Sequence, residues 1–171
     1  MQRTLITAAS IVLLGFAGSA LAHEDEVNTK LKGYEEVPAV SSTGTGRFKS
    51  KIDKASQTLN YEISYSGLEG TVTQSHIHIG QRGVTGGITL WLCQTPGTPV
   101  TPLPRTPNCP QSGTVIGSLS AADVIGPAGQ GVAAGEFAEV LAAIRAGVAY
   151  VNVHSSKHGG GEIRGQLRDD D

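Results

Sequence analysis

Aromatic residues, sulfur-containing residues and clustered positive charge are all scarce in this chain, and each shortage narrows what it can be. Its 171 residues include one tryptophan, one methionine and two cysteines, and aromatic residues make up 5%. The net charge is −2 without a basic cluster, which argues against nucleic acid and anionic membranes as partners. After residue 22 no apolar run reaches the roughly 20 residues of a membrane-spanning helix, so no span is predicted.

The motifs of common catalytic sites are missing as well. The chain contains no Gly-x-Ser-x-Gly elbow, no phosphate-binding loop and no His-Glu-x-x-His helix. The segment 80–87 is rich in glycine, but it opens no predicted helix, so we interpret it as a turn. Ser155 and Ser156 lie near His154, yet the sequence places no acid to orient that histidine as a base. Nucleophilic catalysis is therefore not supported.

The first 22 residues are typical of a secretory signal peptide. Arg3 precedes an apolar stretch over 5–16, and Ala20-Leu21-Ala22 forms a small-x-small cleavage pattern. A membrane-spanning helix is the competing interpretation, but polar residues and glycines interrupt the stretch. No cysteine stands at the cleavage point to carry a lipid anchor. We predict cleavage after Ala22, export to the periplasm or the exterior, and a single domain over residues 23–171.

Two cysteines, Cys93 and Cys109, flank a proline-rich stretch that can form neither a helix nor a paired strand. In an oxidising compartment a Cys93–Cys109 disulfide would close the base of this loop. Such a closure is worth about 3 kcal/mol in the chain-entropy model. Two free thiols or a metal-binding pair are the alternatives, and export favours the disulfide. We assign it a structural role.

Short alternating segments and abundant glycine predict a mainly β fold. Alternation over 46–53 places Phe48 and Ile52 on one face, and alternation over 58–65 is cleaner, which predicts a hairpin with one buried face. Helical spacing of apolar residues predicts a helix over 137–144, stopped by Gly147. The fold class is an antiparallel β-sandwich or flattened Greek-key barrel with one short helix. Other strands are expected at 29–40 (ended or confined to an edge by Pro38), 72–79, 87–92, 114–119, 149–154 and 162–167, with a short turn at 120–124.

Three of the five histidines lie in predicted strands where their direction can be read. Because side chains alternate along a strand, His76 and His78 share one face, and Ile77 and Ile79 point to the core. By the same rule His154 lies with Asn152 on the outer face of its strand. Three imidazole nitrogens gathered from two strands would bind copper or zinc and leave a fourth position open. His158, in the following loop, is a candidate fourth ligand.

A structural interpretation of the same residues stays open. The last strand would place Glu162, Arg164 and Gln166 on the same outer face, so a hydrogen-bonded polar cluster bracing the strands explains the pattern equally. The spacing alone does not show that the two histidine strands are neighbours. The predicted new terminus, His23, could chelate copper through its amino group and ring, but a flexible, solubilising start is the simpler interpretation.

Five segments of the chain follow a recognisable pattern: LKGYEEVP (31–38), YSGLEG (65–70), SHIHIG (75–80) with Gly83 and Gly86-Gly87, AGVAYVNVHS (146–155) and GEIRGQL (161–167). With these segments the chain resembles a known family, the CHRD domain, first described in chordin and widespread in bacterial secreted proteins. The resemblance extends over nearly the whole of the predicted exported part, and its last blocks are highly specific. Departures are small: Ala39 follows Pro38 where a second proline is usual, and Ser75 replaces a common alanine.

The resemblance implies a β-sandwich or barrel outside the cytoplasm with no established enzymatic activity. The insertion between Cys93 and Cys109 looks like that of a bacterial secreted subgroup. The arrangement is also distantly similar to copper–zinc superoxide dismutase, whose copper strand carries His-x-His in a β-barrel. The bridging histidine and zinc-loop ligands of that enzyme have no evident counterparts here, apart from the unplaced His158.

Three functional hypotheses follow from these patterns. The leading one is a non-enzymatic, extracytoplasmic binding module of CHRD type, with a surface copper or zinc site built from the strand histidines and an unknown protein or small ligand as partner. The alternative is a dismutase-like redox metalloenzyme, in which Arg164 would guide a small anion to the metal. The third is a purely structural or adhesive domain whose histidines only brace strands.

Overall fold

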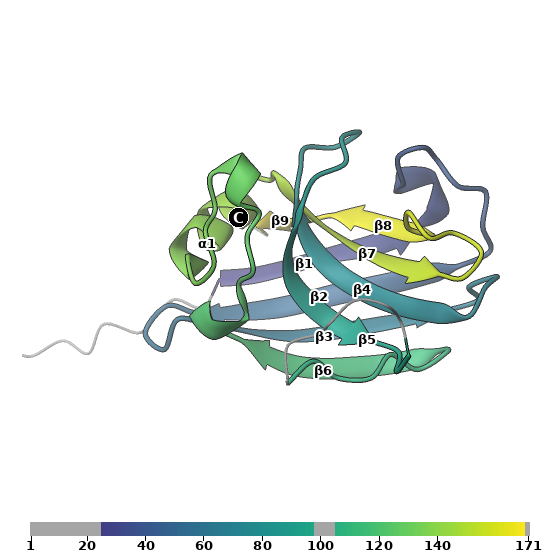
Figure 1. Ribbon diagram of the computed structural model, residues 1–171, viewed down its shortest axis with the longest axis horizontal. Coiled ribbons are helices and arrows are strands. Elements are labelled where there is room, and N and C mark those ends of the chain that lie inside the picture. The colour runs from purple at the N-terminus through teal and green to yellow at the C-terminus, as the bar shows by residue number, and fades with distance from the viewer. Residues whose placement is uncertain (1–24, 98–104, 170–171) are drawn as a thin grey trace, which may run out of the picture.

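The computed structural model describes residues 25–97 and 105–169, and one antiparallel sheet dominates them (Figure 1). Eight strands follow one another in the order β5-β4-β7-β8-β1-β2-β3-β6, and β9 pairs with β1. The sheet curls into a nearly closed barrel whose two edge strands are β5 and β6. The strands are Asp25–Lys32 (β1), Thr45–Asp53 (β2), Thr58–Ser66 (β3), Val72–Ile79 (β4), Ile88–Gln94 (β5), Gly113–Leu119 (β6), Ala149–Ser155 (β7), Ile163–Gln166 (β8) and Arg168–Asp169 (β9).

The predicted mainly β fold class is confirmed, and so is its best-defined hairpin. β2 and β3 pair along their whole length, from Thr45 opposite Ser66 to Asp53 opposite Thr58. Phe48 is buried in the core while the lysines that alternate with it are exposed, as the sequence pattern predicts. The β-branched and aromatic residues of β3 alternate in the same way, because one face of the hairpin packs inward and the other meets water.

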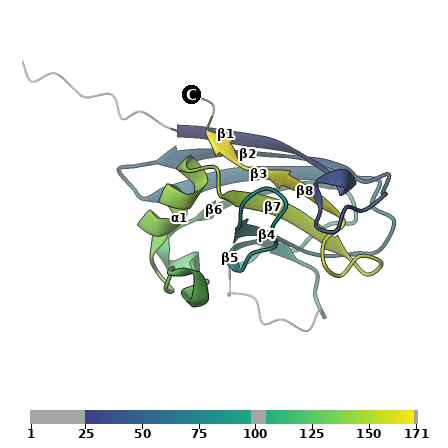
Figure 2. The ribbon, with the colours of Figure 1, turned by 90° about the horizontal axis from the view of Figure 1, so that it is seen from above.

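The first predicted strand, 29–40, is wrong in both of its limits. β1 begins at Asp25 and ends at Lys32, and a short 3-10 helix over Gly33–Glu35 follows it. The carbonyl oxygen of Gly33 accepts hydrogen bonds from the backbone N–H groups of Glu36 at 3.0 Å and Val40 at 2.9 Å. These local bonds replace sheet pairing, so residues 33–42 turn back beside β8 (Figure 2). We call residues 33–42 the 33–42 segment.

The predicted helix is confirmed as α1, Phe137–Arg145, which lies at one end of the barrel (Figures 1 and 2). Its four apolar residues at helical spacing are buried against the sheet end. Gly147 follows with a φ of 67°, a left-handed conformation that favours glycine after a helix. Two further 3-10 helices are Ala121–Asp123, within the predicted turn, and Ala128–Gln130.

The seam between the two sheet edges is closed by the segment that precedes β6. Cys93 and Cys109 form the predicted disulfide. Beside it the backbone of Gln94 donates to the carbonyl of Pro107 at 2.9 Å, and Tyr61 reaches across the barrel to the carbonyl of Leu92 at 2.6 Å. The predicted loop between the cysteines lies partly in 98–104, and the predicted signal peptide and His23 lie in 1–24; both stretches are outside the described residues.

Candidate metal centre

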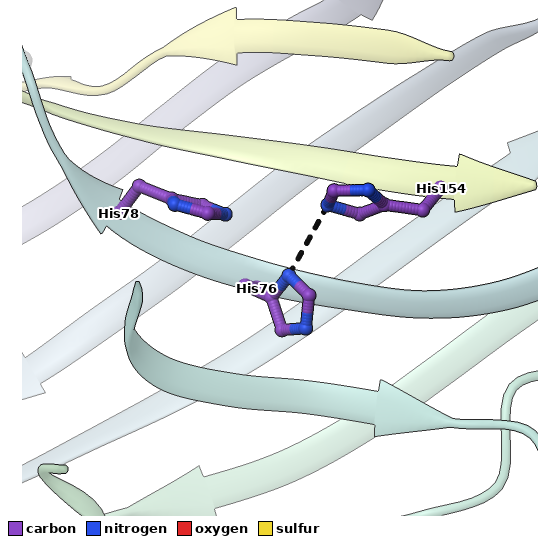
Figure 3. A group of neighbouring side chains, drawn as sticks. All are labelled: His76, His78 and His154. Atoms are coloured by element: carbon purple, nitrogen blue, oxygen red, sulfur yellow. Dashed lines mark hydrogen bonds between the residues drawn. The ribbon is translucent and has the colours of Figure 1, made fainter. Parts of the chain in front are cut away.

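The three strand histidines converge because β4 and β7 are neighbours. In this antiparallel pair His76 lies opposite Asn152, and His154 lies opposite Gln74. The Nδ1 atom of His76 is 3.2 Å from the Nε2 atom of His154, and the ring of His78 points toward that of His154 (Figure 3). Each of the three residues offers one nitrogen, and these nitrogens lie within 4.8 Å of one another. Three histidines are therefore close enough to bind one metal ion.

The histidines lie on the predicted face of their strands, but that face is not a surface. His76 is 0% exposed, and His78 and His154 are each 6% exposed. The expectation of a surface site is therefore wrong. Three connecting segments lie over this face: the 33–42 segment, the loop 80–87 and the loop 155–161. Each contacts the buried layer, through Glu36, the carbonyl of Gly86 and the carbonyl of Gly159 respectively.

Two backbone carbonyls determine which nitrogen of the His78 and His154 rings carries the proton and which keeps a lone pair. The Nδ1 atom of His78 lies 2.9 Å from the carbonyl oxygen of Gly86, and the Nδ1 atom of His154 lies 3.0 Å from that of Gly159. A carbonyl only accepts, so both Nδ1 atoms carry the proton and both Nε2 atoms keep a lone pair. The Nε2 atom of His78 is buried and has no hydrogen bond of normal geometry, although the side chain of Asn152 is near enough to raise the pKa of His78. Carbonyls that hold histidines in this way are typical of metal sites.

Burial keeps all three rings neutral near neutral pH. It lowers the pKa of His78 to about 4, with the contact to the Gly86 carbonyl acting in the opposite direction. Burial also lowers the pKa of His154 and, together with the neighbouring imidazoles, that of His76. Neutral imidazole is the form that binds metals, so no proton has to leave the rings before an ion enters at pH 7.

Two aromatic rings pack directly on the histidines. Trp91, the only tryptophan of the chain, stands nearly perpendicular to His76, with ring centroids 4.1 Å apart. Tyr150 stacks on His78 with centroids 4.7 Å apart and an interplanar angle of 4°. Tyr150 alternates with Asn152 and His154 along β7, so its place on this face was readable from the sequence; the contact of Trp91 depends on the pairing of β5 with β4.

The polar cluster that the sequence offered as a structural alternative is also present. In register, Asn152 faces Arg164 and Tyr150 faces Gln166 across β7 and β8. The Arg164 guanidinium is 2% exposed and lies over the ring of Tyr150, with its carbon 3.4 Å from the centroid. We call the buried side chains of this face the polar layer: His76, His78, Tyr150, Asn152, His154, Glu162, Arg164 and Gln166.

Within the polar layer, the hydrogen bonds of Glu162 are made with loop residues and the end of β7, and not with the three histidines. Its carboxylate accepts hydrogen bonds from Ser42 Oγ at 2.6 Å, from the backbone of Glu69 at 2.7 Å and from Ser155 Oγ. These bonds hold down its pKa against the effect of burial, which acts upward. With its oxygens occupied in this way, Glu162 anchors two loops to the barrel.

His158 is not one of the three residues whose nitrogens converge. Its backbone N–H lies 3.2 Å from both the carbonyl oxygen and the Oγ atom of Ser155, which fixes the loop after β7. Its side chain is half-buried, and its Nε2 atom has no hydrogen-bond partner. Its role as a fourth ligand stays a prediction.

Sequence analysis missed Glu36, which the 33–42 segment brings onto the polar layer. Glu36 is 7% exposed, and its side chain hydrogen-bonds with that of Asn152. Burial raises its pKa to about 7, although the positive charge of Arg164 acts in the opposite direction. The residue stands in the LKGYEEVP block, but its contact depends on the chain turning at Gly33, which alternation does not reveal.

A surface groove lies elsewhere, across β1, β2, β3 and β6. Its lining mixes Lys49, Lys51 and Glu62 with the exposed side chain of Ile116, and it contains no histidine. Among the described helices, none has the combination of length and hydropathy that a membrane crossing requires. Among the described residues, the side chains that lie close enough to bind a metal ion together are those of the buried polar layer.

Comparison with known proteins identifies the family. A family model of the CHRD domain matches residues 27–167, which include most of β1, all of β2 to β8, α1 and every residue of the polar layer. No curated protein and no solved structure matches the chain. The family match supports a module-type interpretation with an unspecified partner, while the likeness to superoxide dismutase stays a prediction. The chain belongs to the CHRD domain family.

Proposed function

We infer that this CHRD domain is an extracytoplasmic, non-enzymatic module that binds one copper or zinc ion in the polar layer. The ligands are His76 Nδ1, His78 Nε2 and His154 Nε2. One observation carries the proposal: the carbonyls of Gly86 and Gly159 hold the two Nδ1 atoms and leave lone pairs on the buried Nε2 atoms.

The distances suit a shared ion. Imidazole nitrogens bind zinc at about 2.0–2.1 Å, so two ligands of one ion lie roughly 3–4 Å apart, depending on the angle between them. The His76–His154 nitrogens are 3.2 Å apart and already meet this condition. The largest separation in the group, 4.8 Å at most, exceeds this range by under about 1 Å.

Metal binding accounts for a feature that strand bracing leaves unexplained. A buried nitrogen without a partner costs about 1–3 kcal/mol. The Nε2 atom of His78 is in that position, although its ring is held firmly by Gly86 and Tyr150. An ion would satisfy this nitrogen together with the facing nitrogens of His76 and His154. A cluster that only braced the strands would gain nothing from holding it there.

The disulfide and the leader support a place outside the cytoplasm. Disulfides form and persist in oxidising compartments and are rare in the cytosol. The Cys93–Cys109 bond closes the sheet seam, and the sequence 1–22 has the features of an export signal. We place the module in the periplasm or outside the cell.

The redox alternative needs Arg164 to attract an anion, and the surroundings of Arg164 weigh against it. The guanidinium is 2% exposed, and its Nη2 atom donates to the carbonyl of Gln81 at 3.0 Å, under the loop 80–87. A charge covered in this way presents no open funnel to a substrate. The module interpretation is therefore preferred.

Metal analysis of protein purified from the periplasm tests the proposal. We expect about one equivalent of copper or zinc in the wild type, and its loss in His76→Ala and His154→Ala. Trp91, at 4.1 Å from His76, provides a second measurement, because bound Cu²⁺ should quench its fluorescence. The exposed β3 substitution Glu62→Gln is the control for handling and folding. Equal metal content in both histidine variants and the wild type would contradict the proposal.

A further inference from the structure

We propose that Asn152 supplies a fourth ligand to the ion through Oδ1, and that the Glu36 carboxylate orients this amide and provides the counter-charge for the cation. This inference rests on the metal site proposed above and names two residues that complete it. It makes the site a product of three segments, β4, β7 and the 33–42 segment.

The position of the amide oxygen suits a ligand. Asn152 Oδ1 lies 3.0 Å from His154 Nε2, close to the 3.2 Å that separates His154 Nε2 from His76 Nδ1. Two atoms bonded to one ion at about 2.0–2.2 Å lie roughly 3.0–3.4 Å apart when the angle between them is 90–110°. Both separations therefore correspond to edges of one coordination polyhedron around a shared ion.

The contact between Asn152 and His154 is poor without a cation. His154 gives its Nδ1 proton to the carbonyl of Gly159, so its Nε2 atom presents a lone pair. The amide oxygen of Asn152 also presents lone pairs, and the two acceptors face each other at 3.0 Å. A metal ion between the two atoms would accept a lone pair from each, so that two coordinate bonds would replace the repulsion between the lone pairs.

The Glu36 carboxylate determines which end of the amide faces the histidine. It is hydrogen-bonded to the Asn152 side chain, and a Cβ atom at Gly161 would lie 2.2 Å from Glu36 Oε1 and 2.9 Å from Asn152 Nδ2, so the two groups lie beside the same glycine. A cation bound nearby favours the ionised form of this carboxyl group, which only accepts hydrogen bonds and so selects the NH₂ end of the amide. The oxygen is then directed to His154 and the proposed ion. Glu36 is thus a positioning residue.

The charges of the polar layer also require Glu36. Arg164 is buried next to Asn152 in register, so an ion bound here shares its interior with a second positive charge. The carboxylate of Glu162 is engaged by Ser42, Ser155 and the backbone of Glu69. The Oε1 atom of Glu36 has no hydrogen-bond partner. Glu36 is therefore the carboxylate placed to offset the added cation.

Titrations with Zn²⁺ alone and Cu²⁺ alone, in competition with a chelator, test the inference on the disulfide-bonded protein. Glu36→Gln keeps the shape and the hydrogen bond but removes the charge, and we expect the affinity to fall about 10- to 100-fold, as for other residues that orient ligands. Glu35→Gln is the matched control, since it removes the same charge one residue earlier from an exposed ion pair with Arg82. Its affinity should equal that of the wild type.

Asn152→Leu should weaken binding at least as much as Glu36→Gln and change the Cu²⁺ electron paramagnetic resonance spectrum, because the ligand set changes. The exchange Asn152→Asp with Glu36→Gln restores the pair in reverse, with a carboxylate ligand and an amide donor. This double variant should bind Zn²⁺ at least as tightly as the wild type. It also keeps the test decisive if Asn152→Leu does not fold.

The outcomes separate this inference from the metal site itself. If the wild type binds neither ion, the proposed function fails. If the wild type binds and Glu36→Gln matches Glu35→Gln, or Asn152→Leu keeps both affinity and spectrum, the inference is overturned while the three-histidine site stands. A His158→Ala variant that alone changes the spectrum would also overturn it, by identifying His158 as the fourth ligand.

Discussion

In β2 and β3 alternate side chains reach toward solvent, whereas in β7 and β8 no side chain is exposed. Both pairs of strands alternate apolar and polar residues in sequence. In the first pair this pattern separates core from water. In the second pair it separates an apolar core, with Val151 and Ile163, from the polar layer under the loops. Alternation therefore identifies the face of a strand but does not tell what covers that face.

β7 and β8, with the polar layer under the loops, form the covered half of the barrel, and β2 and β3 form the exposed half. In the covered half each polar group needs a hydrogen-bond partner, and the loops supply many of these partners. Burying a polar group without a hydrogen bond costs free energy, so the loops over the polar layer must present matching atoms. The carbonyls of Gly86 and Gly159 do so for two histidines, and Gln166 Nε2 donates to the carbonyls of Gly80 and Gly147 at 2.9 Å each. The exposed half has no such requirement, because water satisfies its lysines.

The largest expected effect tests whether the two halves share one core. Phe48→Ala removes a fully buried ring from β2 and should lower the free energy of unfolding by about 3–5 kcal/mol. Because Phe48 lies on the inner face and not in the polar layer, the metal affinity of the folded fraction should stay unchanged. Chemical denaturation and metal titration of the same samples measure both. A large loss of affinity would show that the halves are coupled through the core.

Acid should destabilise the covered half before the exposed one. The folded-state pKa of His78, about 4, is below the ordinary value of about 6.5, so the unfolded chain takes up the proton first. The stability of the metal-free protein should therefore fall as the pH drops from about 6.5 to 4, by roughly 2–4 kcal/mol for His78. His76 and His154 act in the same direction.

Glu36 opposes this trend, because burial raises its pKa from 4.5 to about 7. Between pH 4.5 and pH 7 the folded protein therefore binds this proton more tightly than the unfolded chain, and its stability rises as the pH falls. One carboxyl acts against three imidazoles, so the net loss in acid should remain. Thermal unfolding of the wild type and His78→Gln across this range measures it. The variant should show the flatter profile, and identical profiles would refute a neutral, buried His78.

A bound ion should stabilise only a protein with an intact polar layer. At a free metal concentration of 100 times the dissociation constant, binding adds about 2.7 kcal/mol to the free energy of unfolding. The increase should vanish in His76→Ala and persist in Lys49→Ala, which changes the exposed face of β2. Differential scanning calorimetry with and without a chelator measures the increase. Equal stabilisation of both variants would indicate binding outside the polar layer.

The smallest expected effects compare two polar side chains that point away from the apolar core. Gln166 of β8 is covered by loops, whereas Lys49 of β2 is exposed. Gln166→Ala leaves the buried carbonyl of Gly80 and the half-buried carbonyl of Gly147 without their donor and should cost about 1–3 kcal/mol. Lys49→Ala removes an exposed side chain and should change stability by no more than about 0.5 kcal/mol. Urea denaturation resolves this difference. Similar values for the two variants would mean that the loops do not seal the polar layer.

Much of the fold and part of the candidate site could be predicted from the sequence. The direction of His76, His78 and His154 follows from alternation, because their neighbours Ile77 and Val153 belong to the core. Their convergence could not be predicted, since it depends on β4 pairing with β7, strands that are distant in sequence. The segments that carry the resemblance to the CHRD family contain all three histidines, but the resemblance does not give this geometry.

Burial of the site was equally beyond local patterns. A polar residue at every second position looks the same whether water or a loop covers it. Glu36 shows the limit most clearly, because the strand predicted through it ends at Lys32 and the chain turns at Gly33. That turn depends on hydrogen bonds to residues up to Val40 and on the close approach of Val40 to Gly33, where a Cβ atom would lie 2.3 Å from the Val40 oxygen.

The separation of 78 positions between His76 and His154 has a consequence for when an ion can enter. A nascent or translocating chain holds the early pair but lacks the late ring, which arrives only when β7 docks beside β4. The complete set of nitrogens therefore exists only once β7 has docked beside β4. With the proposed export and metal site, the supply of ions where folding finishes, and not where the chain is synthesised, would decide which element the protein acquires.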